Sequence, residues 1–342
     1  MFLSILIPVF NAENHIINCL QSILDQDFPE GSYEVIIIND GSTDQSKLVI
    51  SEFIKNTSNI IFIDQTNQGN AKTRNQLFNL AKGDYVYCLD ADDYLVPKTL
   101  KYVLDFAINN KLDFVGFKSR NTLIANEENN AIEYKDYQAT IYSGIDYLTS
   151  NPLPNVEVWW FLVKRELLND FDIRLDPITM ADVVFTYKVV LRAKRMCILP
   201  IHVHWYFQSP VSVMRSKGSM AEQKVRLANH TFEMAKRLNN LIENIDSYNI
   251  GGDPNVKNDP ILKKDYYCFF MIIKYLRFEK NSQKIKDVIN ILEQKKMYPF
   301  VNHVRIHKCP YFLEKFINSI INNKRIVFML ISVFAIFKTK HN

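Results

Sequence analysis

The sequence predicts an α/β fold in which a mostly parallel sheet is flanked by helices, with a helical C-terminal extension after it. Three observations support this prediction. Over the first hundred residues, short apolar runs alternate with amphipathic segments of helical period. The runs are apolar on both faces, as are strands of a parallel sheet that helices cover on both sides. A polar cluster follows each run, which is typical of sheets that bind ligands beyond the carboxyl ends of their strands.

Four strands and three helices are expected in the first hundred residues. The strands are expected at Leu3–Val9, Glu34–Asn39, Ile60–Asp64 and Tyr85–Leu89, and the helices at Asn14–Gln26, Asp44–Lys55 and Asn70–Ala81. Apolar spacing places Ile16, Ile17, Leu20, Ile23 and Leu24 on the inner face of the first helix, and Leu48, Val49, Phe53 and Ile54 on that of the second. The polar clusters after the four strands are therefore expected to converge on one edge of the sheet.

The rest of the chain changes in character along its length. Residues 151–214 mix patterns and are rich in aromatic side chains, and from Met220 onward we expect mostly helices. From Ile261 to the end, 16 Lys and Arg stand against five Asp and Glu. The apolar run Ile326–Phe337 is bracketed by bases and is too short to span a bilayer. It fits either a helix lying on an anionic membrane surface or a terminal helix packed on the protein's own core.

Composition excludes several classes of protein. A chain of 342 residues that is 47% hydrophobic and 23% charged can build a sizeable core, and a net charge of +4 is too small to indicate nucleic acid binding. The five cysteines are scattered, which argues against disulfides or zinc and favours the cytoplasm. No basic segment precedes the apolar start and Pro8 interrupts it, so we interpret it as a buried strand rather than a signal peptide.

An acidic cluster, Leu89-Asp90-Ala91-Asp92-Asp93, follows the fourth expected strand. Three carboxylates within four residues repel one another unless a cation or solvent compensates them. A divalent cation that bridges a diphosphate would use such a cluster, because it takes only one or two protein oxygens. The acidic cluster could also be an ordinary turn exposed to solvent. Its position among the other converging polar clusters disfavours that alternative.

Two further polar clusters fit a nucleotide. In the cluster from Asp40 to Asp44, Gly41 permits a tight turn and the Asp40 carboxylate can accept hydrogen bonds from a base or ribose. The cluster from Asn67 to Asn75 opens a helix, where backbone amides and bases suit a phosphate. Each cluster alone is also consistent with an ordinary turn or helix start.

Together these motifs resemble the family-two inverting glycosyltransferases, which have the GT-A fold. The matching segments are Ser4-Ile5-Leu6-Ile7-Pro8-Val9-Phe10-Asn11, Ile38-Asn39-Asp40-Gly41-Ser42-Thr43-Asp44, Asn67-Gln68-Gly69 with Arg74-Asn75, and Gly83-Asp84-Tyr85 leading to Leu89-Asp90-Ala91-Asp92-Asp93. The resemblance implies that Pro8, Val9, Asn11, Asp40, Gly69, Arg74, Asp90 and Ala91 line the nucleotide site, and that Asp92 binds Mn²⁺ or Mg²⁺. It favours a UDP-sugar donor.

The resemblance continues more weakly on the acceptor side. Trp159 and Trp160 resemble a segment that shapes the acceptor pocket, although core packing explains them equally well. Met180-Ala181-Asp182 resembles the segment whose Asp is the general base, with Ala181 where a Glu is common; Asp182 could instead cap a helix. Trp205-Tyr206 with Ser212-Val213-Met214-Arg215 resembles a segment that closes over the donor. His202 and His204 share one face of an expected strand and are interpreted as structural.

We therefore predict an inverting, metal-dependent, non-processive glycosyltransferase of bacterial surface polysaccharide synthesis that acts on a glycan or lipid-linked glycan. Residues 1–218 would form the GT-A domain, with a nucleotide-binding half (1–100) and an acceptor-binding half (101–218). Residues 219–342 would form the basic helical extension, with peripheral contact to the inner face of the cell membrane. A nucleotide-sugar-binding module without catalysis and a nucleotidyltransferase are the alternatives.

Overall fold

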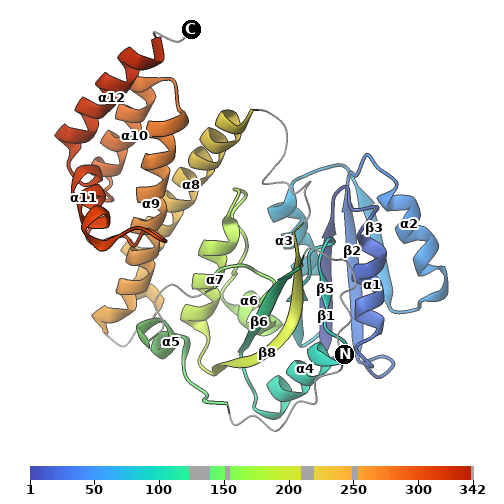
Figure 1. The fold of residues 1–342 in the computed structure, drawn as a ribbon. Helices are drawn as coiled ribbons and strands as arrows, with labels where there is room; N and C mark the ends of the chain where they lie inside the picture. Colours follow the sequence, from blue (N-terminus) through green and yellow to red (C-terminus); the bar gives the residue numbers. More distant parts are fainter. Residues whose placement is uncertain (123–138, 151–154, 209–218, 249–252, 340–342) are drawn as a thin grey trace. The chain divides into compact units, whose positions relative to one another are not determined.

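The computed structural model describes residues 1–122, 139–150, 155–208, 219–248 and 253–339. The chain divides into two compact units (Figure 1). Unit 1 comprises Met1–Tyr147, Asn155–Pro177 and Ala181–Pro210, and unit 2 comprises Leu148–Pro154, Ile178–Met180 and Val211–Asn342. The unit boundary expected at residues 218 and 219 stays a prediction.

Unit 1 is built on one mixed sheet whose described strands run in the order β3-β2-β1-β4-β7-β6-β8-β5. The bounds are β1 Leu3–Val9, β2 Tyr33–Asp40, β3 Ile60–Gln65, β4 Tyr85–Cys88, β5 Tyr94–Leu95, β6 Phe114–Thr122, β7 Phe161–Lys164 and β8 Met196–Phe207. Strands β1 to β4 are parallel, β7 is antiparallel to both of its neighbours, and β6 and β8 are parallel to each other. The predicted α/β fold with a mostly parallel sheet is confirmed.

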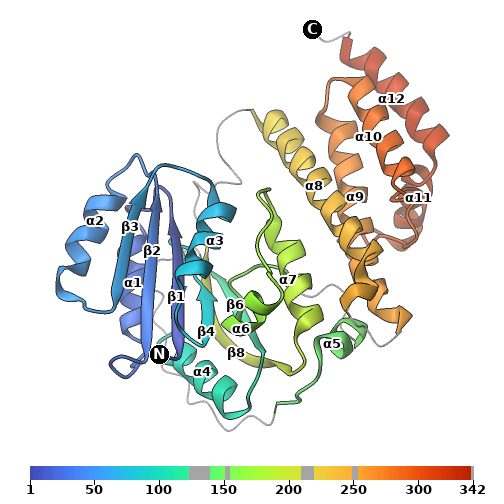
Figure 2. The same cartoon turned by 180° about the vertical axis from the view of Figure 1, so that it is seen from behind.

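Helices cover both faces of this sheet, as the two opposite views show (Figures 1 and 2). The bounds are α1 Ile16–Leu24, α2 Ser46–Phe53, η1 Ile54–Asn56, α3 Asn70–Leu80, α4 Thr99–Asn109, α5 Gly144–Ser150, α6 Arg165–Asp170 and α7 Ala181–Arg192. Helices α1, α2 and α4 share one core with alternate residues of β1 and β2. Helix α3 packs on the other face, where Phe78 stacks on Phe185 of α7 with ring centroids 5.4 Å apart.

Two details of the predicted helices were wrong. Ile17 is 38% exposed and Leu48 is 56% exposed, although apolar spacing had placed both inside. Helix α2 begins at Ser46, two residues later than expected, and its buried face runs through Ser46 and Ile50. Since those residues lie one turn apart, the inner face is shifted away from Leu48.

Unit 2 consists of helices, as predicted from Met220 onward. The bounds are α8 Met220–Glu243, η3 Ile245–Tyr248, η4 Pro254–Lys257, α9 Asn258–Phe278, α10 Ser282–Gln294, α11 Tyr311–Ile321 and α12 Lys324–Thr339. A capping box formed by Ser219 and Glu222 starts α8. Helix α12 buries Val327 and Ile331 in the core of this unit. Within the described residues, no helix has the length and apolar character needed to cross a membrane.

Candidate active site

The polar clusters after β1, β2, β3 and β4 meet at the carboxyl edge of the sheet. Parallel register pairs Val9 with Asn39 and Asn39 with Asp64, so the loops that follow these strands start side by side. The neighbouring pair of β1 and β4 is also parallel, with Leu6 opposite Cys88 just before the acidic cluster. The expected convergence on one edge is confirmed by the hydrogen bonds between the loops.

Asn11 joins the loop after β1 to the loop after β2. It has a left-handed backbone, with φ of 53°, which Asn tolerates better than most residues. Its Oδ1 accepts a hydrogen bond from the Thr43 amide at 2.8 Å, and its own amide donates to Ser42 Oγ at 2.9 Å. Pro8 remains partly exposed beside this junction, whereas the side chain of Val9 is buried and only its backbone can meet a ligand.

Asp40 is buried and holds the loop that opens α3. Its Oδ1 accepts from the Gln68 amide at 2.8 Å and its Oδ2 from the Gly69 amide at 2.9 Å. Gln65 Nε2 donates a third hydrogen bond to Oδ1, also at 2.9 Å. In this conformation the carboxylate therefore binds backbone amides of its own protein, and any contact to a base would be added to these.

Two glycines allow these loops to lie so close. A side chain at Gly41 would place its Cβ 2.7 Å from the Asn67 amide nitrogen, and its φ is 71°. Gly69 has a φ of 89° and open space where a Cβ would stand. The exposed backbone at the start of α3 is thus left accessible to a ligand, as a phosphate contact requires.

The three carboxylates of the acidic cluster lie in three different environments. Asp90 forms an ion pair with Arg74 of α3. Asp92 forms no such ion pair with the described residues; burial, together with the charges of Asp90 and Asp93, raises the pKa of its carboxyl to about 7. Ala91, between them, is buried. Asp93 points inward and is almost fully buried.

The donor set around Asp92 suits a hard divalent cation. A raised carboxyl pKa in a cluster of like charges means that negative charge there lacks compensation. Among the described residues, no group of three or more His, Cys, Asp or Glu side chains is arranged to hold a metal. Mg²⁺ and Mn²⁺ nevertheless bind with one or two protein carboxylates when a diphosphate supplies further oxygens, so Asp92 fits the predicted role.

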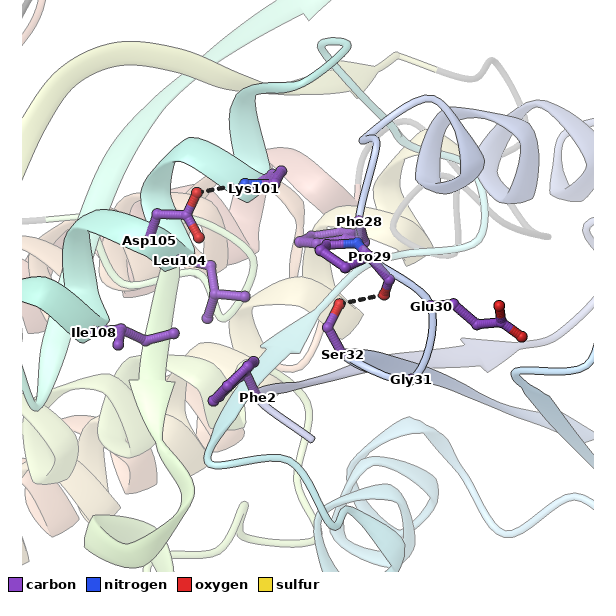
Figure 3. A pocket seen from close by; sticks show the side chains of 10 residues that line it. All are labelled: Phe2, Phe28, Pro29, Glu30, Gly31, Ser32, Lys101, Leu104, Asp105 and Ile108. Carbon is purple, nitrogen blue, oxygen red and sulfur yellow. Dashed lines mark hydrogen bonds and ion pairs between the residues drawn. The ribbon is translucent and has the colours of Figure 1, made fainter.

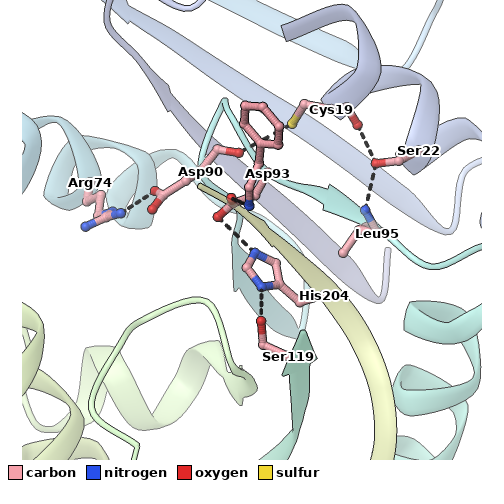
Figure 4. A network of polar contacts seen from close by, with 9 residues as sticks. Cys19, Ser22, Arg74, Asp90, Asp93, Leu95, Ser119 and His204 are labelled. Atoms are coloured by element: carbon pink, nitrogen blue, oxygen red, sulfur yellow. Dashed lines mark hydrogen bonds and ion pairs between the residues drawn. The ribbon is translucent and has the colours of Figure 1, made fainter. Parts of the chain in front are cut away.

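Asp93 is bound to β8 through His204 (Figure 4). The Asp93 Oδ2 lies 3.0 Å from His204 Nε2, and its Oδ1 accepts from the Phe207 amide at 2.8 Å. His204 Nδ1 lies 2.9 Å from Ser119 Oγ on β6. This link was not predicted; the signals for it in the sequence are the two histidines on one expected strand and the third Asp of the acidic cluster.

The two tryptophans differ. Trp159 is partly exposed and stacks on His204 at 4.4 Å between ring centroids and on Tyr206 at 5.6 Å. Trp160 is 1% exposed and packs edge-on against Phe114, so its side chain belongs to the core of the described structure, and its predicted contact with an acceptor stays a prediction. Of this pair, only Trp159 can present a ring to a sugar.

Asp182 lies at the second position of α7, one residue beyond the start of the helix, so it is not the N-cap residue. Burial raises the pKa of its carboxyl to about 6; the Arg74 guanidinium opposes this rise, and Glu157 and Asp90 reinforce it. Arg74 thus acts electrostatically on Asp182 while pairing with Asp90. Its buried Nε has no hydrogen-bond partner among the described residues.

A clamp between α3 and the chain before α7 fixes this neighbourhood. Asn75 donates to the Leu175 carbonyl at 2.9 Å and accepts from the Leu175 amide at 2.9 Å. Arg174 extends the clamp through two hydrogen bonds to Asn79 Oδ1. The segment expected to close over the donor is only partly described: Trp205 and Tyr206 lie on β8, and Ser212 to Arg215 lie outside the described residues.

A cavity of about 410 Å³ lies elsewhere, at the amino edge of the sheet (Figure 3). Its lining includes Phe2 before β1, Ser32 before β2, and the ion pair of Lys101 with Asp105 on α4. None of the predicted site residues lines it. The candidate active site is instead the set of loops at the carboxyl edge.

Comparison with known proteins gives a family match. Residues 4–171 match the model of glycosyl transferase family 2. An uncharacterized glycosyltransferase of Haemophilus influenzae is 31% identical over 233 residues, which are 68% of this chain and 86% of that protein. The poly(ribitol-phosphate) β-N-acetylglucosaminyltransferase TarS of Staphylococcus aureus is 26% identical over 209 residues, 60% of this chain. The matches cover only 17–35% of the length of the first curated relatives.

Solved structures share the fold. TarS 1-349 in complex with UDP-GlcNAc superposes with a TM-score of 0.55 at 20% identity, covering 91% of this chain and 99% of that one. The mannosyltransferase PcManGT of Pyrobaculum calidifontis, in complex with GDP-Man and Mn²⁺, gives 0.54 at 14% identity, covering 98% of this chain and 87% of that one. At these identities the likeness concerns the fold.

Proposed function

The chain belongs to glycosyl transferase family 2, and we propose that it moves a sugar from a nucleoside-diphosphate sugar to a hydroxyl group of a glycan, with inversion at the anomeric carbon. The observation that carries the proposal is the position of Arg74. This one side chain pairs with Asp90 of the donor loops and acts on the pKa of Asp182, the candidate base. The proposed donor residue Asp90 and the proposed base Asp182 thus both interact with the Arg74 guanidinium.

The donor is proposed to bind along the carboxyl edge. Backbone of Pro8 and Val9 would contact the base, together with Asn11 and Asp40, and Asp90 with Ala91 would lie beside the ribose. The backbone that follows Gly69, whose own amide donates to Asp40, and the Arg74 side chain would lie nearest the phosphates. UDP is the proposed nucleotide, and the structures of TarS with UDP and with UDP-GlcNAc support it by likeness.

A divalent cation, Mn²⁺ or Mg²⁺, is proposed to bind Asp92. It would supply positive charge to the diphosphate as that group leaves. The chain's own contribution is the placement of Asp92. Asp90 pairs with Arg74 and Asp93 turns inward, so within the described part of the chain Asp92 is the carboxylate of the cluster that has no ion-pair partner. The structure of PcManGT with Mn²⁺ supports this by likeness.

Asp182 is proposed to act as the general base in a single displacement. The acceptor hydroxyl oxygen forms its bond to the anomeric carbon while the bond from that carbon to the diphosphate oxygen breaks. The hydroxyl proton passes to the Asp182 carboxylate, and the electron pair of the broken bond leaves with the nucleoside diphosphate. A pKa of about 6 leaves Asp182 mostly ionised at neutral pH yet basic enough to take a proton.

The acceptor is proposed to be a glycan or lipid-linked glycan of bacterial surface polysaccharide synthesis. Trp159 offers the one partly exposed ring of the tryptophan pair, and aromatic rings suit the apolar face of a sugar. The name of TarS, a poly(ribitol-phosphate) glycosyltransferase, supports a polymeric acceptor by similarity.

Calorimetric titration with UDP, GDP and dTDP, each with and without Mn²⁺, tests donor binding. We expect one nucleotide to bind only with the metal and the Asp92→Ala variant to lose about 10²-fold in affinity. Asp105→Ala is the matched control, since Asp105 lies at the amino edge of the same sheet. Equal loss in both variants, or metal-independent binding, would contradict the role of Asp92.

A nucleotide-sugar-binding module without catalysis is the second candidate, because Ala181 stands where a Glu is common in the family. The two functions differ in one measurement. The transferase releases free UDP faster when acceptor is added, whereas the binding module releases none above the uncatalysed rate.

Peripheral contact with an anionic membrane at the cytoplasmic face is also proposed, with α11 as a second candidate surface beside the predicted run Ile326–Phe337. Helix α12 turns Val327 and Ile331 into the core of unit 2. On α11, Phe312 is 75% and Phe316 is 61% exposed, and Lys315, between them in sequence, is exposed as well, with its Nζ 4.6 Å from the centroid of the Tyr311 ring. Exposed aromatic rings beside bases suit an anionic headgroup region.

Flotation with vesicles tests this contact. Phe312→Ser with Phe316→Ser should abolish binding to vesicles containing phosphatidylglycerol, whereas Leu48→Ser, which changes an apolar residue of unit 1 that is 56% exposed, should leave it unchanged. If the wild-type protein floats with neither anionic nor phosphatidylcholine vesicles, the membrane contact is wrong.

A further inference from the structure

Two buried side chains, Asp93 at the end of the acidic cluster and His204 on β8, have no role in the proposed reaction. Asp93 is 1% exposed and His204 is 0% exposed. A buried polar pair costs free energy unless each atom is hydrogen-bonded, and here both oxygens of Asp93 and both nitrogens of His204 have partners. A fully satisfied pair of this kind fixes the position of whatever is attached to it.

On one side, the pair holds the loop that carries Asp90 and Asp92. The Asp93 amide donates to the Asp90 carbonyl at 3.0 Å, which closes the turn. The next two residues, Tyr94 and Leu95, form β5 and pair with Trp205 and His204 of β8. The acidic loop is therefore tied to β8 by the backbone after it and by the Asp93 side chain within it (Figure 4).

On the other side, the pair holds the candidate acceptor platform. The Trp159 indole lies on the His204 ring at 4.4 Å between centroids and 17° between planes. Ser119 fixes the rotation of that ring through Nδ1. Any tilt of the imidazole would therefore tilt the indole above it.

We propose that His204 is a positioning residue that sets the acidic loop through Nε2 and the plane of Trp159 through its ring, and so ties donor affinity to acceptor recognition. The inference rests on the proposed function, because it assumes that Asp92 serves the donor and Trp159 the acceptor. His204 itself touches neither substrate.

Two conservative variants separate the two tasks. His204→Gln places an amide nitrogen near the position of Nε2 and can still donate to Asp93, but it removes the flat ring beneath Trp159. His204→Asn reaches only toward Ser119 and leaves Asp93 without its partner. The readouts are Mn²⁺-dependent UDP affinity by calorimetry and the acceptor KM from initial rates.

We expect His204→Gln to keep UDP affinity within about threefold and to raise the acceptor KM about tenfold. His204→Asn should lower UDP affinity about 10- to 100-fold, the size of loss seen when the outer support of a metal site is removed, because the loop that carries Asp92 then loses its anchor through Asp93. Ser119→Ala, a smaller change that should fold in any event, should raise the acceptor KM with UDP affinity unchanged. Thermal unfolding measured on every variant separates these effects from loss of folded protein.

A role in folding alone would move both constants together in both His204 variants, in proportion to the loss of stability, and would overturn the inference. So would a Ser119→Ala variant with an unchanged acceptor KM. Failure of the proposed function is distinguishable, because the wild-type protein would then not bind UDP with Mn²⁺ at all.

Discussion

The donor side and the acceptor side of unit 1 are held together in different ways. On the donor side, polar side chains of one loop bind the backbone of the next, as Asn11 binds Thr43 and Asp40 binds Gly69. On the acceptor side, Trp159 is placed by ring stacking and Asp182 by burial within the first turn of α7. The donor side is therefore held by a network of hydrogen bonds between loops, whereas the acceptor side is held by the packing of buried and stacked side chains.

The largest expected effect is that of Asp182→Asn, which tests the acceptor side. The Asn side chain cannot take a proton, so turnover should fall about 10²- to 10⁴-fold while UDP affinity stays nearly unchanged. Rapid-quench or coupled UDP-release assays measure the loss. Transfer within a few-fold of the wild-type rate would exclude Asp182 as the base and point to Glu157, since Asp93 is buried with both oxygens hydrogen-bonded.

The same variant should be more stable than the wild type. Burial raises the folded-state pKa of Asp182 from 3.8 to about 6, so the folded protein disfavours the charge that the unfolded chain carries. At pH 7.5 the Asn variant should gain on the order of 1 kcal/mol in free energy of unfolding, and the gain should vanish below about pH 4. A helix-terminal Asp of purely structural use would show a loss instead.

A smaller effect is expected from removing one hydrogen bond of the network on the donor side. Asp40→Asn replaces an oxygen that accepts from the Gly69 or Gln68 amide with a nitrogen that donates, so one backbone amide loses its partner. The cost of an unsatisfied group, about 1–3 kcal/mol, should appear as a loss of UDP affinity of roughly 5- to 150-fold. Thr43→Ala, which keeps the backbone amide that Asn11 accepts from, is the matched control and should change affinity little.

Lowering the pH to the pKa of Asp182 should reduce the acceptor kcat/KM about twofold. Asp182 must be ionised to accept the proton, and it is protonated below its pKa of about 6. The acceptor kcat/KM should therefore be flat above pH 7, halve near pH 6 and fall about tenfold for each unit below. A limb of slope two, or one centred near pH 4, would show that a different group controls the rate.

The smallest expected effect is that of Trp159→Phe. A smaller ring keeps part of the stacking surface, so the acceptor KM should rise only a few-fold, with UDP affinity and kcat nearly constant. Trp160→Phe provides the contrast: its ring lies in the core, so its loss should lower stability and leave the acceptor KM unchanged. If the two variants show the reverse pattern, the assignment of the tryptophans is wrong.

The sequence predicted the donor half of the fold closely. The first strand runs over Leu3–Val9 as expected. The second differs from its expected range by one residue at each end, and the third and fourth differ by one residue at one end, because continuous Ile and Val runs of a parallel sheet leave little choice of boundary. The tight loops after the second and third strands could also be predicted, because Gly41 and Gly69 have the positive φ that favours glycine.

The remainder depended on contacts between residues far apart in the chain. Local pattern does not show that β7 lies between β4 and β6, nor that β5 pairs with a strand a hundred residues later. Trp160 is buried and Trp159 is partly exposed because the Trp160 ring lies against Gly116, where an added Cβ would lie 2.3 Å from it. His204 was assigned a structural role, but its partner Asp93 could be found only in three dimensions.

The clamp of Asn75 on Leu175 has a consequence for exchanging parts between related enzymes. It ties the helix that carries Arg74 to the chain leading into the helix that carries Asp182. A hybrid that takes residues 1–100 from one relative and the following part from another would keep every motif and still separate these two partners, unless the clamp residues are matched. Choosing the junction so that Asn75 and the chain around Leu175 come from the same parent would allow the specificity of one enzyme to be grafted onto the donor apparatus of another.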